Sequence, residues 1–329
     1  MTEKTAAPFL LLPFYKDYLW GGKTLASLFG KQGAPERLAE SWELSAHPDG
    51  ESVIAGGLFH GQGLSAFIRN NPLACGTAVP PGSEFPLIVK LIDAADRLSV
   101  QVHPDGEYAR SAEGGRGKTE MWYILRSLPG ASLYCGFSRP VTRKEVEQRI
   151  REGSLTEVLR SVPAEPGDVF YIPAGTIHAV GAGIVLAEVQ ESSNITYRVF
   201  DYGRAGADGR PRPLHIGKAL DVLRLDEGCP PPPGVEIGFR SVPGGELRLL
   251  CSCPSFTCSV LELNGRFSQK MGDEFFLSLL CLDGKARLSS SGGGLGIGTG
   301  DSAFVPAGRG EVSLEGLGEF LLTFPGRPE

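Results

Sequence analysis

The sequence predicts a mainly β protein built from two similar β units. Glycine and proline are abundant, with 45 and 25 of 329 residues, and they recur between short apolar runs. A pattern also repeats: "GDVFYIPAGTIHAV" begins at Gly167 and "GDSAFVPAGRGEVS" begins at Gly300. Each copy indicates a turn, a strand with apolar alternation and a second sharp turn. Two copies predict two β-barrels or sandwiches along the chain.

Strand-like apolar runs follow one another on both sides of a proline-rich stretch. In the first part of the chain they are residues 85–94, 98–104, 120–125, 168–173 and 183–190. In the last third they are residues 256–265, 274–284, 302–308 and 318–324. Their number and spacing favour turn-linked β structure over helical structure.

A helical insertion is predicted at residues 141–162. Thr142 and Glu145 have the spacing of a capping box, and Val146 and Ile150 fall on one helix face. Gly153 and the following serine interrupt this segment, and a weaker helix is expected at residues 216–225.

The run of four prolines between Cys229 and Gly234 predicts a linker, because proline cannot donate to a helix or a central strand. We therefore expect residues 1–234 to form the first unit, with the N-terminal segment and the helical insertion. Residues 235–329 are expected to form the second unit.

The composition argues against several classes of partner. A net charge of −6 gives no reason to expect nucleic acid or an anionic membrane. The apolar N-terminal run "FLLL" is too short for a membrane span and lacks a small-residue cleavage site, so a cytoplasmic location is expected. Cys251, Cys253 and Cys258 have no nearby histidine and no zinc-ribbon spacing, and we expect ordinary reduced thiols.

Polar side chains interrupt one apolar strand and indicate a metal site. Gln101 and His103 are two residues apart, so both project from the same face of a strand. Glu120 begins another strand, and His178 closes the first copy of the repeat. Two imidazoles, a carboxylate and an amide oxygen suit a divalent cation. The residues alone leave open that these side chains are ordinary hydrogen-bonded or surface groups.

The other histidines lack such partners, and His47, His60 and His215 are expected in loops or at a rim. In the second copy of the repeat, Glu311 stands where the first copy has His178. One unit is therefore predicted to be active and the other structural.

The motifs around these residues resemble those of a known family. The spacing from Gly167 to His178 is similar to the second motif of cupin barrels. "QVH" at residues 101–103, with Glu120 after a longer hairpin, resembles the first motif as it occurs in type I mannose-6-phosphate isomerases. "DYLWGGKTLASLFGK", "LAESWELSAHPDGESVI" and "NITYRVFDYGR" are also similar to segments of that family, so the resemblance covers most of the first 205 residues.

The resemblance implies two cupin-like jelly-roll barrels, of which the first bears a metal and the second is degenerate. It implies one zinc ion per chain, held by Gln101, His103, Glu120 and His178. It implies catalytic roles for Arg198, Lys118 and Glu188, and substrate contacts for Ser99 and Lys90.

The implied substrate is a phosphorylated hexose. Mannose 6-phosphate and fructose 6-phosphate would interconvert by proton transfer between C1 and C2, through a cis-enediol or enediolate. The proton-transfer base stays open among Lys118, Glu188 and zinc-bound water. Two other functions are retained as alternatives: a non-catalytic bicupin that binds sugar phosphates, and an iron-dependent cupin oxygenase.

Overall fold

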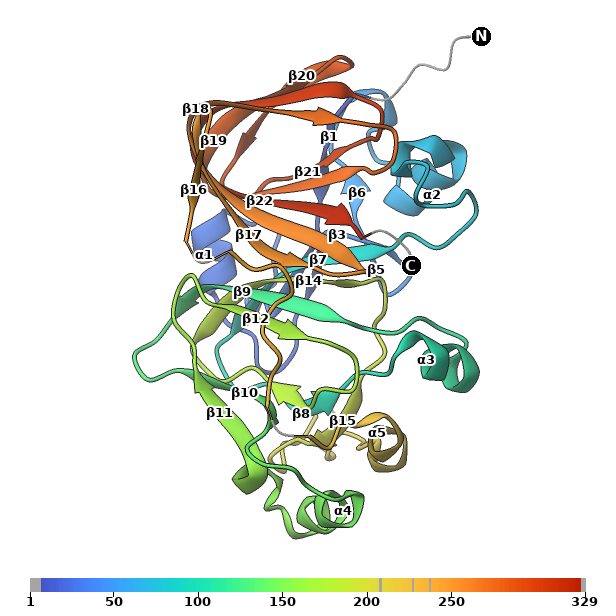
Figure 1. Ribbon diagram of the computed structural model, residues 1–329, viewed down its shortest axis with the longest axis vertical. Coiled ribbons are helices and arrows are strands. Elements are labelled where there is room, and N and C mark those ends of the chain that lie inside the picture. The colour runs from blue at the N-terminus through green and yellow to red at the C-terminus, as the bar shows by residue number, and fades with distance from the viewer. Residues whose placement is uncertain (1–6, 207–208, 227, 237, 327–329) are drawn as a thin grey trace.

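The computed structural model describes residues 7–206, 209–226, 228–236 and 238–326, and it is mainly β as predicted. Two β units lie one above the other along the long axis of the molecule (Figure 1). The metal-site candidates all lie in one of them, which we call the first unit. None of the described helices is both long and apolar enough to cross a membrane.

The first unit consists of two sheets. The six-stranded sheet has the order β12-β9-β14-β7-β3-β2, formed by Val169–Ile172, Glu120–Ser127, Ile184–Glu191, Leu87–Ala94, Glu40–Leu44 and Phe14–Lys16. The five-stranded sheet has the order β11-β10-β13-β8-β15, formed by Leu159–Pro163, Ser132–Phe137, His178–Ala179, Val100–Val102 and Tyr197–Phe200.

Strand β7 explains how a lysine comes to point into the first unit. All eight of its residues are buried, so both faces of the strand are covered. Leu87, Val89 and Leu91 belong to the apolar cluster that reaches into the second unit. Lys90 lies between them in sequence and therefore projects from the opposite face, into the first unit.

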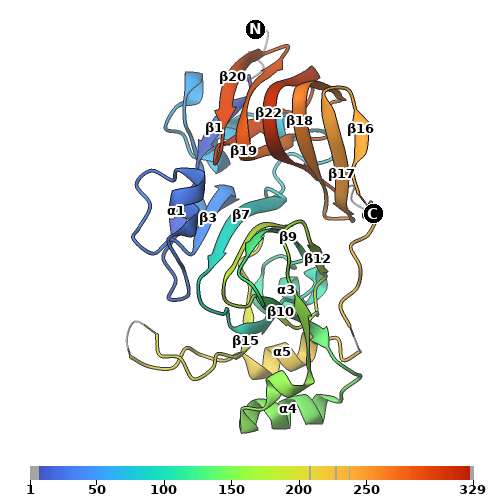
Figure 2. The ribbon, with the colours of Figure 1, turned by 90° about the vertical axis from the view of Figure 1, so that its left-hand side faces the viewer.

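The second unit is a nine-stranded sheet that curls over its own apolar cluster (Figure 2). Its order is β16-β17-β18-β22-β19-β21-β1-β6, with β20 also pairing with β19. The strands are Arg240–Val242, Gly245–Ser252, Phe256–Met271, Gly310–Pro325, Leu277–Ser290, Ser302–Val305, Phe9–Leu12 and Val53–Ile54, with β20 at Gly293–Gly298.

Two strands of this sheet come from the N-terminal part of the chain. Leu10 pairs with Ala303, and Leu11 pairs with Ile54. The predicted division at residue 234 placed both strands in the first unit, whereas their hydrogen bonds join them to the second. The rest of that division stays a prediction.

The repeat found in the sequence has the expected local structure in both copies. In the first, β12 is followed by a turn and by β13, which begins at His178. In the second, β21 is followed by a turn and by β22. Glu311, the counterpart of His178, is exposed and pairs with Lys270 on β18. The second copy therefore lacks a buried polar side chain at this position.

Five α-helices are described, and short 3-10 turns accompany them. The helices are α1 (Thr24–Phe29), α2 (Leu64–Asn70), α3 (Gly106–Glu113), α4 (Arg143–Glu152) and α5 (Ile216–Val222). The 3-10 turns are η1 (Gly57–Phe59), η2 (Pro72–Cys75) and η3 (Leu155–Val158), and a small hairpin is formed by β4 (Ala46–His47) and β5 (Gly50–Glu51).

The helical insertion is confirmed only in its first half. The Thr142 side chain accepts a hydrogen bond from the Glu145 N–H at 3.2 Å, and Val146 and Ile150 are buried. Gly153 ends the helix with a φ of 72°, a conformation that glycine adopts without strain. The prediction of helix up to residue 162 was wrong, because the chain leaves η3 and pairs with β10 as strand β11.

A disulfide that the sequence analysis did not predict joins Cys135 to Cys229, with a Cα–Cα distance of 5.3 Å. It ties β10 to the start of the proline linker, 94 residues further along the chain. Cys135 also lies opposite His178 in the sheet. The expected free thiols at Cys251, Cys253 and Cys258 are confirmed.

We expect Cys229→Ser to lower the free energy of unfolding under oxidising conditions. A cross-link that closes a loop of this length restricts the unfolded chain and contributes about 4.7 kcal/mol in the chain-entropy account. Urea unfolding with and without dithiothreitol measures the effect. The free thiol variant Cys253→Ser serves as the control. Equal stability of the parent and Cys229→Ser without reductant would contradict the prediction.

Candidate metal centre

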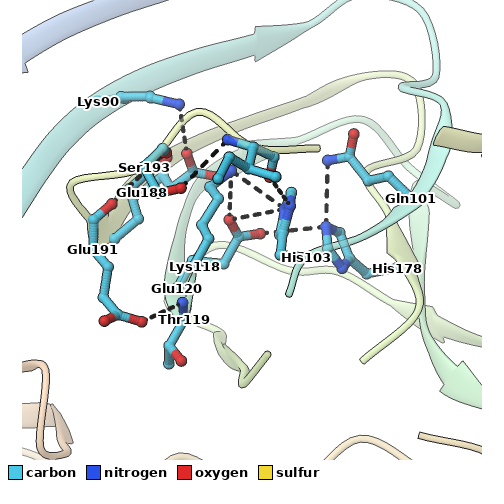
Figure 3. A network of polar contacts seen from close by, with 12 residues as sticks. Lys90, Gln101, His103, Lys118, Thr119, Glu120, His178, Glu188, Glu191 and Ser193 are labelled. Atoms are coloured by element: carbon cyan, nitrogen blue, oxygen red, sulfur yellow. Dashed lines mark hydrogen bonds and ion pairs between the residues drawn. The ribbon is translucent and has the colours of Figure 1, made fainter. Parts of the chain in front are cut away.

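Three strands of the first unit bring two histidines and a glutamate to one point between the sheets (Figure 3). His103 follows directly after β8, and His178 begins the neighbouring strand β13, where it pairs with Gln101. Glu120 is the first residue of β9 in the other sheet. The predicted convergence of these distant positions is therefore observed.

The three side chains are close enough to share one ion. One ligand atom from each of His103, Glu120 and His178 lies within 4.8 Å of the others. Each imidazole Nε2 is 3.4 Å from a different oxygen of the Glu120 carboxylate. All three residues are at most 1% exposed. A divalent cation is the expected occupant of such a group of donors.

Backbone carbonyls fix the proton positions on both imidazoles. His103 Nδ1 donates to the Ile195 carbonyl, and His178 Nδ1 donates to the Thr176 carbonyl, each at 2.9 Å. A carbonyl oxygen only accepts, so Nδ1 carries the proton and the Nε2 lone pairs face Glu120. Burial, followed by the charge of Lys118, lowers the pKa of His103 to about 3, so this ring is uncharged at neutral pH.

The buried carboxylate has fewer partners than burial normally requires. Neither oxygen of Glu120 accepts a hydrogen bond from the described residues. Burial raises the pKa of Glu120, but the Lys118 ammonium, 2.9 Å from Oε2, lowers it together with His103 and His178, and the pKa stays well below its usual value. An ionised carboxylate facing two imidazole lone pairs calls for a cation among them, so the residues fit a bound metal.

Gln101 and Lys118 complete the inner group of predicted residues. The Gln101 amide nitrogen is 3.3 Å from His178 Nε2, and a half-turn of the amide would present its oxygen instead. Lys118 Nζ is 3.3 Å from His103 Nε2. Both side chains therefore lie beside the candidate metal ligands, and their roles as zinc ligand and catalytic residue stay predictions.

Lys90 and Glu188 form a second charged group on the six-stranded sheet. They pair across β7 and β14, and Lys90 Nζ lies 3.1 Å from Glu188 Oε1. Trp122 Nε1 donates to the other Glu188 oxygen at 2.9 Å. Burial raises the pKa of Glu188 despite the opposing charge of Lys90. Glu188 is thus a carboxylate that holds a proton more readily than usual.

The sequence analysis missed Glu40. Its carboxylate is 3.6 Å from Lys90 Nζ and accepts a hydrogen bond from Trp42 Nε1 at 2.7 Å. The tryptophan ring in turn lies beneath Lys90, 4.7 Å from the ammonium. An acidic residue at the start of a fully buried strand was the available signal.

Arg198 and Ser99 lie on the five-stranded sheet next to Gln101. Arg198 pairs with Gln101 across β15 and β8, and its Nε donates to Ser99 Oγ at 3.2 Å. The nearby Asp201 carboxylate is taken by Arg204 and Arg212. Among the described residues, no carboxylate forms a salt bridge with Arg198, so its charge is available to an anion.

Comparison with known proteins establishes the family. The model for the phosphomannose isomerase type I catalytic domain matches residues 9–120, and that for the mannose-6-phosphate isomerase cupin domain matches residues 246–325. Mannose-6-phosphate isomerase ManA of Bacillus subtilis is 35% identical over 320 residues, covering 97% of this chain and 99% of that protein. The chain belongs to the type I mannose-6-phosphate isomerase family.

Further relatives agree with this assignment. The mannose-6-phosphate isomerase of Streptococcus mutans is 36% identical over 284 residues, 86% of this chain and 87% of that protein. The crystal structure of the Bacillus subtilis mannose 6-phosphate isomerase matches with a TM-score of 0.89 at 30% identity, covering 97% of this chain and 99% of that one. The predicted family and its cupin-like fold are confirmed.

We expect Glu120→Gln and His178→Ala each to weaken binding of a divalent metal at least 100-fold, because the first removes the negative charge of the isomerase-family site and the second removes an imidazole ligand. Calorimetric titration of the metal-free protein with Zn²⁺ measures this. His60→Ala, which changes an exposed histidine, is the matched control. Unchanged affinity in both site variants would show that the metal binds elsewhere.

Proposed function

We propose that this protein is a metal-dependent aldose–ketose isomerase that interconverts mannose 6-phosphate and fructose 6-phosphate. The observation that carries the proposal is the buried group of His103, Glu120 and His178, whose carboxylate oxygens accept no hydrogen bond from the described residues. The chain is also related over 97% of its length to such an isomerase. A location in the cytoplasm stays a prediction.

We assign one zinc ion per chain to Gln101, His103, Glu120 and His178. Two imidazoles and a carboxylate are ligands that zinc commonly takes, and Gln101 supplies an amide oxygen beside them. A divalent ion held by these residues would stabilise negative charge that develops on the sugar oxygens at C1 and C2. The protein's own contribution is a buried site in which both rings are held by the Ile195 and Thr176 carbonyls.

Glu188 is our choice for the proton-transfer base. Its pKa is raised by burial, and a carboxylate with a raised pKa can both take a proton from one sugar carbon and return it to the other. Its Oε1 accepts no hydrogen bond from the described residues and lies 3.1 Å from the Lys90 ammonium, while Trp122 donates to Oε2. Lys118 is the rival, but its ammonium already lies against Glu120 and His103.

Arg198 and Ser99 are assigned to the anionic part of the substrate. Arg198 is the site cation without a carboxylate partner among the described residues, and a guanidinium stays charged while it binds phosphate or an enediolate oxygen. Lys90 differs, because Glu188 and Glu40 balance its charge. We therefore assign Lys90 to positioning Glu188 rather than to binding the phosphate.

Purified protein should form fructose 6-phosphate from mannose 6-phosphate, lose this activity in a chelator and regain it with Zn²⁺. A coupled enzymatic assay follows the product, and elemental analysis identifies the native metal. Sugar-phosphate binding without turnover would favour the non-catalytic alternative. Iron in place of zinc, with oxygen consumption, would favour the oxygenase.

Glu188→Gln should lower kcat by at least 100-fold with the metal retained, because general-base catalysis contributes about 10²–10⁴-fold. Lys118→Met, which preserves much of the side-chain volume, should lower kcat less. Metal content and thermal unfolding are measured on both variants. A larger loss in Lys118→Met, with metal bound and fold intact, would transfer the role of base to Lys118.

A further inference from the structure

Arg198 is carried by a strand at the edge of its sheet. β15 is the last strand of the order β11-β10-β13-β8-β15 and pairs only with β8 among the described strands. An edge strand presents main-chain N–H and C=O groups that no further strand can satisfy. The position of Arg198 therefore depends on what covers this open edge.

His215 takes the place of the missing strand. Its N–H donates to the Arg198 carbonyl at 2.8 Å, and its ring Nδ1 accepts from the Arg198 N–H at 3.2 Å. Pro213, two residues earlier, accepts from Arg198 Nη1 at 3.2 Å. A short segment thus satisfies the main chain of Arg198 and also fixes its guanidinium, whose Nε is held by Ser99 on the other side.

The loop segment is itself anchored to the core of the first unit. His215 immediately precedes α5, and its carbonyl accepts the hydrogen bond from the Ala219 N–H. Ala219 and Leu220 are buried in the same apolar cluster as Tyr197 and Val199, which flank Arg198 on β15. The contact therefore joins two packed elements and does not depend on a free loop.

Only the uncharged form of His215 can make the ring contact. Nδ1 accepts a hydrogen bond, so the ring proton must sit on Nε2. In His103 and His178 the proton is instead on Nδ1. Burial lowers the pKa of His215, and the charges of Arg198 and Lys218 lower it further, against the opposing charge of Glu113. The contact is therefore present at neutral pH and is lost as the pH falls through this lowered pKa.

Three charged groups surround the His215 ring, and each lies on a different element. Arg198 lies on β15, Lys218 on α5 and Glu113 at the end of α3. Lys218 and Glu113 form an ion pair at 2.7 Å, and the Tyr197 hydroxyl donates to Glu113 at 2.8 Å. Glu113 is thus engaged with other groups and not with the imidazole.

We propose that His215 is a positioning residue for Arg198. Its uncharged ring holds the main chain of Arg198 at the open edge of the sheet, so that the guanidinium meets the substrate. This inference rests on the proposed function, which gives Arg198 its substrate. It also predicts that part of the loss of substrate binding in acid comes from His215.

The test compares His215→Ala and His215→Asn with the parent and with the control His60→Ala, using mannose 6-phosphate between pH 5 and 8. Asparagine Oδ1 stands one bond beyond Cγ, as Nδ1 does, and accepts a hydrogen bond without titrating in this range. His215→Ala should raise KM about tenfold with a smaller change in kcat, the effect of losing one hydrogen bond near a charged group.

His215→Asn should retain most of the parent kcat/KM at pH 8, and its kcat/KM relative to the parent should rise in acid as the parent imidazole becomes protonated. Dividing kcat/KM of His215→Asn by that of the parent removes the effect of titrations that both proteins share, such as that of the substrate phosphate. In an Arg198→Ala background, His215→Ala should change kcat/KM less than twofold. An unchanged KM in His215→Ala, or a pH-independent ratio for His215→Asn, would overturn the proposal.

A readout that does not need activity separates this proposal from the proposed function. The ring ¹⁵N shifts of His215 should show an unprotonated Nδ1 at pH 8, and Nδ1 protonation should broaden the Arg198 and Tyr197 amide signals. A protonated Nδ1 at pH 8 overturns the proposal whether or not the protein isomerises sugars. Absence of turnover in the parent would instead overturn the proposed function alone.

Discussion

The architecture of the first unit depends on placing one ionised carboxylate in a dry interior. Glu120 is fully buried, and burying an unpaired charge costs more free energy than most domains possess. Lys118 offsets this cost only in part, since both carboxylate oxygens lack hydrogen bonds from the described residues and the Nε2 lone pairs of both imidazoles face them. The fold is therefore adapted to a cation that the protein chain does not itself supply.

Strand register arranges the other polar groups around this centre. On the five-stranded sheet, His178, Gln101 and Arg198 follow one another across three adjacent strands. On the facing sheet, Lys90, Glu188 and Trp122 do the same. Each row would move to the opposite face after a slip of one residue, so the apolar cores on the outer faces also fix the geometry of the site.

The sequence predicted the parts of the site that obey short-range rules. A spacing of two placed Gln101 and His103 together, and the repeat marked His178, while Arg198, Lys118 and Glu188 came from resemblance. The contacts that were missed cross long distances in the chain: Glu40 meets Lys90 only through the pairing of β3 with β7, and Cys135 meets Cys229 after 94 residues. His215 was assigned to a loop because nothing local indicates that it caps the edge of a sheet.

Because β1 and β6 belong to the sheet of the second unit, the order of synthesis affects how this sheet forms. Phe9 finds its neighbour, Phe304, only after almost the entire polypeptide has left the ribosome. Until then β1 can pair with β6 but lacks its other partner, β21, while the first unit can already collapse. The second unit can therefore form its complete sheet only late in synthesis. Nascent chains that end before β21 expose the unpaired apolar edge of β1, which favours aggregation.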